Sequence, residues 1–159
     1  MLKMLLSNPK SSFQRGVIVM ERGDAKRFTA KRFKDPYVLA WRMWFDLRLE
    51  KGVPKENLSP PAKVDSAILS IKRKNEPMIA YKDALLFQNL TSHILKYPQA
   101  PLGMALRRIF TVPQLKLLIK NLGVNNEFTV GSLNEKQWVI VFKTMIRYIP
   151  QSSWPKRKK

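Results

Sequence analysis

The sequence predicts a mixed fold in which an α/β part is followed by an all-α part. Strand patterns occur only in the first half of the chain, as one short, wholly apolar run and two further segments rich in aliphatic residues. A polar segment that ends in a proline, residues 72–77, comes next, and the apolar periodicity after it is helical throughout. We therefore predict three parts, an α/β domain at residues 1–74, a helical domain at residues 75–150 and a basic tail at residues 151–159.

The composition gives the protein a strong positive charge. Its 159 residues include 30 Lys and Arg against 11 Asp and Glu, a formal net charge of +19, and the chain stays basic without its four C-terminal cations. Such a charge favours a polyanionic partner, with nucleic acid the first candidate and an anionic membrane surface the second. The chain has no cysteine and no apolar run of the roughly 18–20 residues that cross a bilayer. We expect a cytoplasmic protein without disulfides or a membrane span.

The first predicted strand needs more neighbours than the chain supplies. Apolar residues within 2–6 predict the last turns of an amphipathic helix, and the run GVIVM at residues 16–20 follows. A short, wholly apolar run is typical of a strand buried on both faces, as in a parallel sheet. The other two strand segments are expected to pair with each other, which leaves one edge of this strand without a neighbour. We therefore expect part of the sheet to lie upstream of Met1.

The other two strand segments, residues 45–50 and 64–72, flank a stiff loop. Pro60 and Pro61 fix two φ angles, remove two backbone donors and exclude a helix or a central strand between the segments. Two strands joined by such a loop predict an antiparallel pair with an exposed loop at its rim. Rigid loops at sheet rims often carry functional residues, and Lys63 is the candidate phosphate contact in this loop.

A basic helix is predicted between these strands, at residues 24–33. Arg27, Lys31 and Lys34 fall at positions i, i+4 and i+7 and would share one face. Like charges at this spacing repel each other by a few tenths of a kcal/mol, so we interpret the face as binding phosphate rather than as a merely solvated surface. The candidate phosphate-binding residues of this stretch are Lys26, Arg27, Lys31, Arg32 and Lys34.

The segment that follows, residues 36–44, predicts a second helix, with Asp35 as N-cap and a proline at its first position. This helix is apolar nearly all round, and Arg42 is its only charged residue. Trp41 and Trp44 are candidates for stacking on RNA bases, but the all-round apolarity favours a place in the core.

The second half predicts a small bundle of short helices. Two N-terminal capping boxes, Thr111 with Gln114 and Ser132 with Glu135, mark helix starts, and Gly123 marks a helix end. Apolar stripes at helical spacing give each helix one face for a shared core. These stripes are Phe87, Leu90 and Ile94; Leu115, Leu118, Ile119 and Leu122; and Trp138, Phe142, Met145 and Ile149.

Residue types and spacing predict no catalytic or metal-binding constellation. No two of the six glycines lie closer than seven positions, so the sequence has no phosphate-cradling glycine loop. The single histidine, His93, lies beside an apolar stripe and is interpreted as a structural or surface residue. Without cysteine, and with scattered carboxylates, the chain offers neither a metal cluster nor an acid–base pair.

Three motifs resemble the ribosomal RNA adenine N6-methyltransferases: VIVMERGDAKRF at residues 17–28, NLSPPAKVDSA at residues 57–67 and RIFT at residues 108–111. In the helical half, the NNE of residues 125–127 makes the chain most similar to the Erm type, which confers macrolide–lincosamide–streptogramin B resistance. The related branch is that of the housekeeping dimethyladenosine transferases. The resemblance covers essentially the whole chain up to its basic tail.

This resemblance implies a Rossmann-like methyltransferase sheet, truncated here to its last strands, followed by a small helical C-terminal domain. Family members bind S-adenosylmethionine through a glycine-rich loop and flip the target adenine onto the aromatic residue of an N-[LI]-P-[YF] motif; neither motif is present here. We therefore expect a C-terminal portion without a methyl-donor site, related to enzymes that modify large-subunit rRNA. The family positions that face RNA correspond to Lys26, Arg27, Arg32 and Lys63, and the charge pattern adds Lys31.

The proline loop departs from the family pattern at two positions. Leu58 stands where an aromatic residue usually packs on the flipped base, and Ala62 replaces the second patterned proline. Base stacking contributes about 1–3 kcal/mol. The resemblance therefore assigns no catalytic residue to this chain and leaves Leu58 as a weakened base-packing position.

Two alternatives to a methyltransferase portion remain open. The chain could be a non-catalytic basic module that binds RNA or the ribosome, and binding that follows rRNA structure in competition with plain duplex RNA would favour it. It could also bind an anionic membrane, but that requires a basic amphipathic helix, and the apolar stripes are better explained by a core. The sequence does not specify an oligomeric state.

Overall fold

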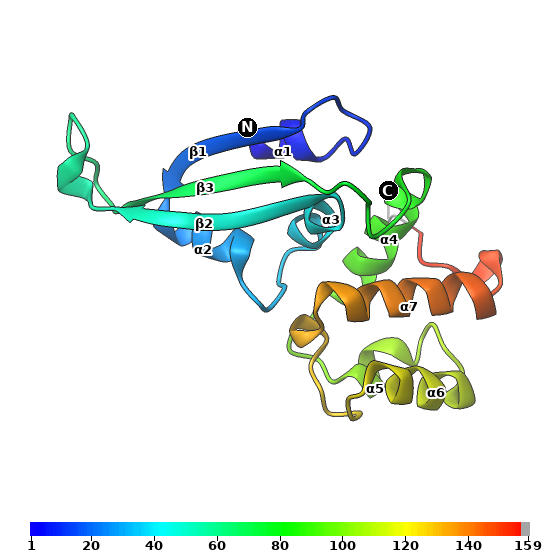
Figure 1. Ribbon diagram of the computed structural model, residues 1–159. Helices are drawn as coiled ribbons and strands as arrows, with labels where there is room; N and C mark the ends of the chain where they lie inside the picture. The colour runs from blue at the N-terminus through cyan, green and yellow to red at the C-terminus, as the bar shows by residue number, and fades with distance from the viewer. Residues whose placement is uncertain (157–159) are drawn as a thin grey trace. The chain divides into compact units, whose positions relative to one another are not determined.

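The computed structural model describes residues 1–156 and divides into two compact units (Figure 1). Unit 1 holds the strands, and unit 2 holds most of the helices. The chain passes from unit 1 to unit 2 for the last time after Pro77, close to the domain boundary expected after residue 74. The segment before the second strand, Lys31–Met43, also falls in unit 2. Unit 1 consists of Met1–Ala30 and Trp44–Pro77, and unit 2 of Lys31–Met43 and Met78–Lys159.

Unit 1 is built on a three-stranded antiparallel sheet with the strand order β1-β3-β2. β1 is Arg15–Glu21, β2 is Phe45–Val53 and β3 is Ser66–Arg73. The central strand, β3, pairs with both neighbours, and the pair Val53 and Ser66 closes the β2–β3 hairpin below the proline loop. The predicted antiparallel pairing of the two strands around this loop is confirmed.

β1 is an edge strand and is not buried on both faces. Its side chains alternate between exposed and half-buried, and Val17 and Val19 are 72% and 55% exposed. The prediction of a doubly buried, parallel-type strand is therefore wrong for this chain, because residues 1–156 supply β1 with one neighbouring strand and cover only one of its faces. The expected strand edge without a neighbour is confirmed for the same residues.

Two helices accompany this sheet. α1, Leu2–Leu6, buries its first and last leucines. α2, Arg22–Thr29, follows β1 directly and packs on the sheet through Ala25 and Phe28, which are both buried. Because Ala25 and Phe28 face the sheet, helical geometry directs the side chains on the opposite side of α2 toward solvent.

Arg73, at the end of β3, fixes the segment that precedes β1. Its guanidinium donates hydrogen bonds to the backbone carbonyls of Pro9 and Phe13, at 2.7 and 2.8 Å. A further bond at 2.8 Å reaches the carbonyl of Ser11. The same guanidinium lies 4.6 Å from the centroid of the Phe45 ring, so one half-buried cation ties three parts of unit 1 together.

α2 ends four residues earlier than the predicted basic helix. Ala30 is extended, with ψ at 148°, and Phe33 is buried and donates its amide to the carbonyl of Gly131 at 2.7 Å. This bond draws the following segment into unit 2, a long-range contact that residue spacing cannot reveal. The predicted shared face of Arg27, Lys31 and Lys34 is therefore wrong.

Unit 2 is a set of short helices around an apolar core. Every residue of the three predicted stripes is buried except Leu115, which is half-buried. Trp41 and Trp44 are 2% and 1% exposed, which confirms the core interpretation over base stacking. The helices are α3 (Pro36–Trp44, whose last residue belongs to unit 1), α4 (Ala84–Ile94), α5 (Leu102–Leu106), α6 (Val112–Leu122) and α7 (Glu135–Tyr148). Single 3-10 turns cover Lys55–Asn57 in unit 1 and Tyr81–Asp83, Val130–Ser132 and Gln151–Ser153 in unit 2.

The predicted caps are confirmed for α6 and displaced for α7. Thr111 and Gln114 form a reciprocal capping box, and Gly123 ends α6 in the left-handed conformation at φ 69°. At α7 the box is made by Asn134 and Gln137, two residues later than predicted. The preceding residues are used in the 3-10 turn, which delays the start of the helix.

The C-terminal segment is partly ordered. A 3-10 turn follows α7, and the indole nitrogen of Trp154 donates to the carbonyl of Ile149 at 2.8 Å. The expectation of a disordered tail is therefore wrong for residues 151–155. The basic residues 157–159 of the predicted tail lie outside the described residues.

Candidate nucleic-acid interface

The cations of α2 lie on its solvent-facing side. Lys26 and Arg27 are exposed and occupy the last turn, where positive charge also interacts favourably with the helix dipole. Arg27 forms an ion pair with Asp24 at 3.4 Å, but both side chains are about half exposed, so the pair contributes little. Lys26 has no carboxylate within ion-pair distance among residues 1–156. Of the two cations, Lys26 is therefore the one with no internal competitor for a phosphate.

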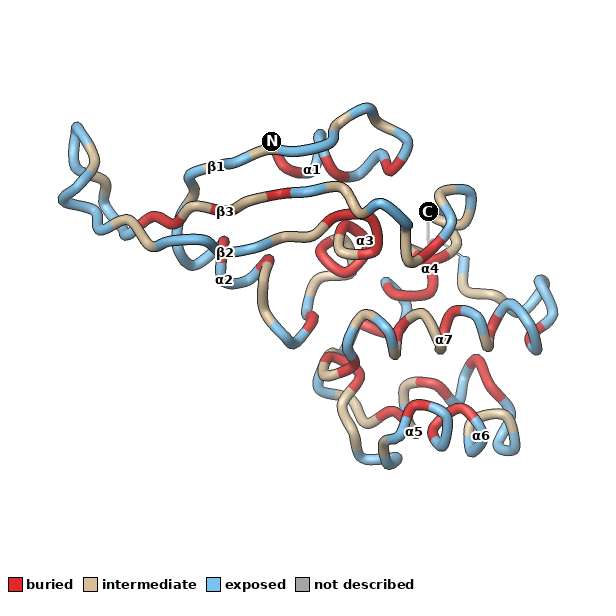
Figure 2. The backbone as a smooth tube through the Cα atoms, viewed as in Figure 1, coloured by how far each residue is buried: buried red, intermediate tan, exposed pale blue. Residues whose placement is uncertain are grey.

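The loop between β2 and β3, residues 54–65, is anchored at its base and exposed along most of its length (Figure 2). Asp65 accepts a hydrogen bond from the amide of Lys55 through Oδ1 at 3.1 Å. The backbone carbonyl of Asp65 accepts another from the amide of Arg22, at 2.9 Å. Lys63 is exposed, and the described part of the chain gives it no carboxylate partner. Lys63 is thus exposed on a loop whose base is hydrogen-bonded.

The five predicted RNA ligands divide between the two units. Because α2 begins at Arg22, the bond from its amide joins the helix to the base of the loop, so the candidate ligands of α2 and the loop lie on connected elements of unit 1. Lys31 and Arg32 are also exposed but belong to unit 2. Arg32 borders a depression of about 10 Å³ beside Gly131, which is too small for more than a water molecule.

Leu58 lies in the β2–β3 loop, immediately after the 3-10 turn of residues 55–57. Its side chain is half-buried, and its amide donates to the carbonyl of Lys55 at 3.4 Å. An aliphatic side chain offers no π-face to a nucleobase. Its role as a weakened base-packing position stays a prediction.

The sequence analysis overlooked a row of cations on α7. Lys136, Lys143 and Arg147 are exposed and, at i, i+7 and i+11, fall within about 40° of one another around the helix. We call these three residues the α7 cationic row. The only carboxylate of α7 is Glu135, which forms an ion pair with Arg42. Periodicity applied to charged residues, as it was to apolar ones, would have found this row.

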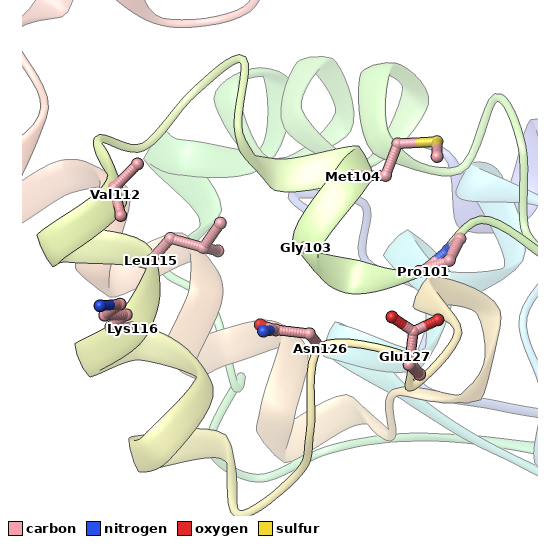
Figure 3. Close-up of a pocket in the computed structure, with 8 residues that line it drawn as sticks. All are labelled: Pro101, Gly103, Met104, Val112, Leu115, Lys116, Asn126 and Glu127. Carbon is pink, nitrogen blue, oxygen red and sulfur yellow. The ribbon is translucent and has the colours of Figure 1, made fainter.

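A groove of about 400 Å³ lies in unit 2 between α5, α6 and the turn after α6 (Figure 3). The side chain of Asn126 lies between Gly103 and Lys116 in this view, and its backbone carbonyl accepts a hydrogen bond from the Gly103 amide at 3.1 Å. Lys116 and Glu127 are its only charged residues. The lining residues are Pro101, Gly103, Met104, Val112, Leu115, Lys116, Asn126 and Glu127.

The resemblance implies S-adenosylmethionine as the cofactor of the family. A nucleotide-type cofactor is usually cradled by a glycine-rich turn from a strand into a helix. The turn from β1 into α2 contains only Gly23, and no atom lies within 4 Å of the position that a Cβ would take there. This turn is therefore not a glycine-rich cradle of that kind.

His93 and the possible metal ligands were the remaining candidates for a chemical site. His93 is exposed near the end of α4, in line with a surface residue. Within residues 1–156 no three His, Cys, Asp or Glu side chains are placed to hold a metal ion. In that same range, none of the helices combines the length and the apolar character that crossing a bilayer requires.

Sequence comparison identifies the family. A family model described as "Ribosomal RNA adenine dimethylase" matches residues 1–147. The chain belongs to this family. It is 51% identical to an rRNA adenine N-6-methyltransferase of Bacillus licheniformis over 158 residues, which is 99% of this chain and 55% of the relative. A relative of the same name from Bacteroides fragilis is 28% identical over 96% of this chain and 57% of its own length. This dimethylase-family chain thus spans about half the length of the curated relatives it matches.

Solved structures show the same relationship at the level of the fold. The crystal structure of the 23S rRNA methyltransferase ErmE has a TM-score of 0.74 and 16% identity, covering 90% of this chain and 59% of ErmE. A dimethyladenosine transferase from Plasmodium falciparum has a TM-score of 0.66 and 16% identity, covering 93% and 63%. The resemblance to Erm-type rRNA adenine N6-methyltransferases is confirmed, and the sheet and helices of this family member correspond to part of such a fold.

Proposed function

We propose that this chain is the C-terminal portion of an Erm-type rRNA adenine N6-methyltransferase and that it contacts RNA through unit 1. A complete enzyme of this type would methylate N6 of a large-subunit rRNA adenine with S-adenosylmethionine, in the cytoplasm, and so confer macrolide–lincosamide–streptogramin B resistance. The present chain keeps an RNA-facing surface and lacks the methyl-donor site. It therefore binds RNA weakly and does not methylate it by itself.

The observation that carries this proposal is the joined pair of α2 and the β2–β3 loop. Both elements expose a lysine that has no carboxylate partner among residues 1–156, and the Arg22 amide bonds the base of the loop. Two cations on connected, bonded elements offer two contacts to the phosphates of an RNA backbone. The family membership of the chain favours RNA over other polyanions.

RNA binding by the full chain tests the proposal. Fluorescence anisotropy with a labelled large-subunit rRNA fragment should give an affinity that falls steeply with salt, by a slope of about 0.7–0.9 per phosphate contact in log–log form. Lys26→Ala and Lys63→Ala should each weaken binding and reduce that slope by about one contact. A slope that neither substitution changes would remove unit 1 from the RNA interface.

Lys10→Ala provides the matched control. Lys10 is an exposed lysine of unit 1 that lies outside both α2 and the loop, so its removal changes the net charge by the same amount. We expect the control to leave the affinity nearly unchanged. Equal losses for all three variants would mean that RNA responds to net charge alone and not to this surface.

The absence of catalysis is tested separately, with the purified chain, S-adenosylmethionine carrying a labelled methyl group and the same rRNA fragment. We expect no label in the RNA above that of a reaction without protein. Transfer of label to adenine N6 would show that the chain holds a donor site and would refute this part of the proposal, whatever the RNA affinity.

A second candidate function is a non-catalytic module that binds RNA or the ribosome. The exposed α7 cationic row favours it, because that row adds a cationic surface on unit 2. Competition decides between specific and general binding: a module of this kind should retain rRNA in an excess of plain duplex RNA. Complete displacement by the duplex would exclude it.

A further inference from the structure

The groove between α5 and α6 combines apolar walls with polar side chains that the protein itself does not use. Its volume of about 400 Å³ lies in the range of small-ligand pockets. Met104 and Val112 line it and are 57% and 67% exposed. Among residues 1–156, neither Lys116 nor Glu127 forms an ion pair, and the side-chain amide of Asn126 makes no hydrogen bond. Apolar walls with a few uncommitted polar groups are typical of a ligand site.

The turn that carries Asn126 is held in place by its backbone. The amide of Glu127 donates to Oδ1 of Asn125 at 3.0 Å, and the amide of Gly103 donates to the carbonyl of Asn126 at 3.1 Å. A Cβ at Gly103 would lie 3.4 Å from the Asn126 Cβ and 3.5 Å from its Oδ1, so the Asn126 side chain packs against this glycine. The Asn126 amide is therefore exposed to a ligand while its backbone is fixed on α5.

The polar groups of the groove match the edge of an adenine base. A primary amide accepts through its oxygen and donates through its nitrogen, and asparagine pairs in this way with N6 and N7 of adenine. The carboxylate of Glu127 only accepts, so it suits a base with an exocyclic amine and opposes the O4 acceptor of uracil. The thioether of Met104 offers a polarisable contact to an aromatic ring.

The charges of the groove give a bound nucleotide one orientation. In Figure 3 the side chain of Asn126 lies between those of Lys116, on α6, and Glu127. A phosphate is attracted by the lysine and repelled by the carboxylate, so it would lie at the α6 side with the base toward Glu127. Unit 2 has many more cations than carboxylates, which favours a nucleotide that belongs to a polyanion over an uncharged ligand.

We propose that this groove binds an unpaired adenosine of the RNA that the chain contacts. The proposal deepens the proposed function and rests on it. In a duplex the base is covered by pairing and stacking, whereas an unpaired base presents both its edge and its ring to a protein. Asn126 would read the base, and Lys116 would hold the phosphate.

A titration of the full, ¹⁵N-labelled chain with adenosine monophosphate, followed by NMR, tests the site. We expect saturable shifts at the amides of Gly103 and Asn126, and binding of uridine monophosphate that is weaker by about tenfold. Asn126→Asp keeps the shape of the side chain but removes its donor. This variant should bind adenosine monophosphate about tenfold more weakly and lose the preference over cytidine monophosphate, since a carboxylate pairs with the cytosine amine. Equal binding of the adenosine and uridine monophosphates, or no saturable shift, would overturn the proposal.

Two matched controls separate the groove from general charge effects. Asn121→Asp makes the same change at an exposed position of α6 outside the groove and should leave the affinity unchanged. Lys116→Ala should weaken the binding of adenosine monophosphate but not of adenosine, whereas Lys82→Ala, at another exposed lysine of unit 2, should affect neither. Equal effects of the two Asn→Asp variants would overturn the proposal. Circular dichroism of each variant verifies that it is folded.

An RNA pair shows whether the groove serves RNA or a free nucleotide. Two hairpins that differ only in one bulged base, adenine or uracil, are compared by anisotropy. We expect the chain to prefer the bulged adenine by about tenfold, and Asn126→Asp to remove this preference. Binding of adenosine monophosphate without that preference would assign the groove to a free nucleotide and overturn the RNA site.

Two further outcomes are distinguished by the same measurements. Shifts at Gly103 and Asn126 that follow protein concentration without any nucleotide would assign the groove to a second copy of the chain and refute the proposal. Lys26→Ala, in unit 1, should weaken the binding of both hairpins equally. If Lys26→Ala has no effect, the unit 1 interface fails while the binding of adenosine monophosphate still decides the groove, so the two proposals fail separately.

Discussion

The two units differ in how complete their cores are and in how their charge is balanced. Unit 2 holds 17 of the 30 Lys and Arg residues but only four of the 11 Asp and Glu, yet α6 and α7 are capped and all but one residue of its apolar stripes are buried. Unit 1 has 13 cations against seven carboxylates and leaves Val17 and Val19 of its sheet exposed. Unit 2 thus carries the stronger excess charge. Exposed apolar side chains occur in both units, and in unit 1 they include two residues of one edge strand.

This difference shows that the net charge of a unit and the burial of its apolar residues are separate indicators of possible partners. The charge of unit 2 is compatible with a finished core because helical cations such as Lys116, Lys120 and Lys143 are exposed, while other faces of the same helices are buried. The exposed valines of unit 1 have no such explanation within residues 1–156. A polyanion can neutralise the first kind of surface, but it does not cover the second, which is apolar.

The largest expected effect concerns the core of unit 2. Trp138 is fully buried on α7, and Trp138→Ala should lower the free energy of unfolding by about 3–5 kcal/mol through lost burial and a residual cavity. Val17→Ala, at an exposed position of unit 1, should cost less than about 1 kcal/mol. Urea unfolding monitored by circular dichroism gives both values. Similar losses for the two variants would show that β1 is buried in solution.

A smaller loss is expected where two backbone segments approach Gly131. A Cβ at this position would lie 2.8 Å from the carbonyl oxygen of Phe33 and 2.9 Å from that of Pro98. Gly131→Ala should therefore destabilise unit 2 by about 1–3 kcal/mol, because backbone atoms must shift to admit the methyl group. The control is Gly23→Ala, where nothing lies within 4 Å. Thermal unfolding of the two variants measures the contrast, and equal melting temperatures would contradict the close approach.

The helix caps of unit 2 should contribute less again. Thr111→Ala and Asn134→Ala each remove the side-chain acceptor of a capping box and should cost about 0.5–2 kcal/mol of unfolding free energy. Ser132→Ala tests where α7 starts, since residue spacing predicts the cap at Ser132 and the structure places it at Asn134. A loss for Ser132→Ala as large as for Asn134→Ala would place the cap at Ser132.

The smallest effect is expected from removing single cations of unit 2 and measuring RNA binding. Lys143→Ala and Arg147→Ala should each reduce the salt dependence by at most one contact, and by less than Lys26→Ala if unit 1 is the main interface. Anisotropy titrations at several salt concentrations give the slopes. Larger reductions from the α7 cationic row than from unit 1 would reverse the proposed order of the two surfaces.

Prediction from sequence succeeded where the signal was local. Proline pairs, capping residues and apolar periodicity act within a few residues, so the hairpin around Pro60, the cap at Thr111 and the buried stripe from Trp138 were all predicted. The candidate ligands Lys26 and Lys63 were also identified from sequence, and their use against RNA stays a prediction. Periodicity extended α2 too far because the bond from Phe33 to Gly131 joins residues about a hundred positions apart.

The sequence by itself determined the family, which segments form strands and which form helices, and the positive charge, because these depend on residue identity and on spacing within single elements. Tertiary structure decided which cations share a unit and where α2 stops. It also decided that one apolar strand lies at an edge with Val17 and Val19 in solvent. The burial of a residue depends on what surrounds it. The neighbour of β1 is β3, and this long-range pairing cannot be read from the spacing of residues within β1.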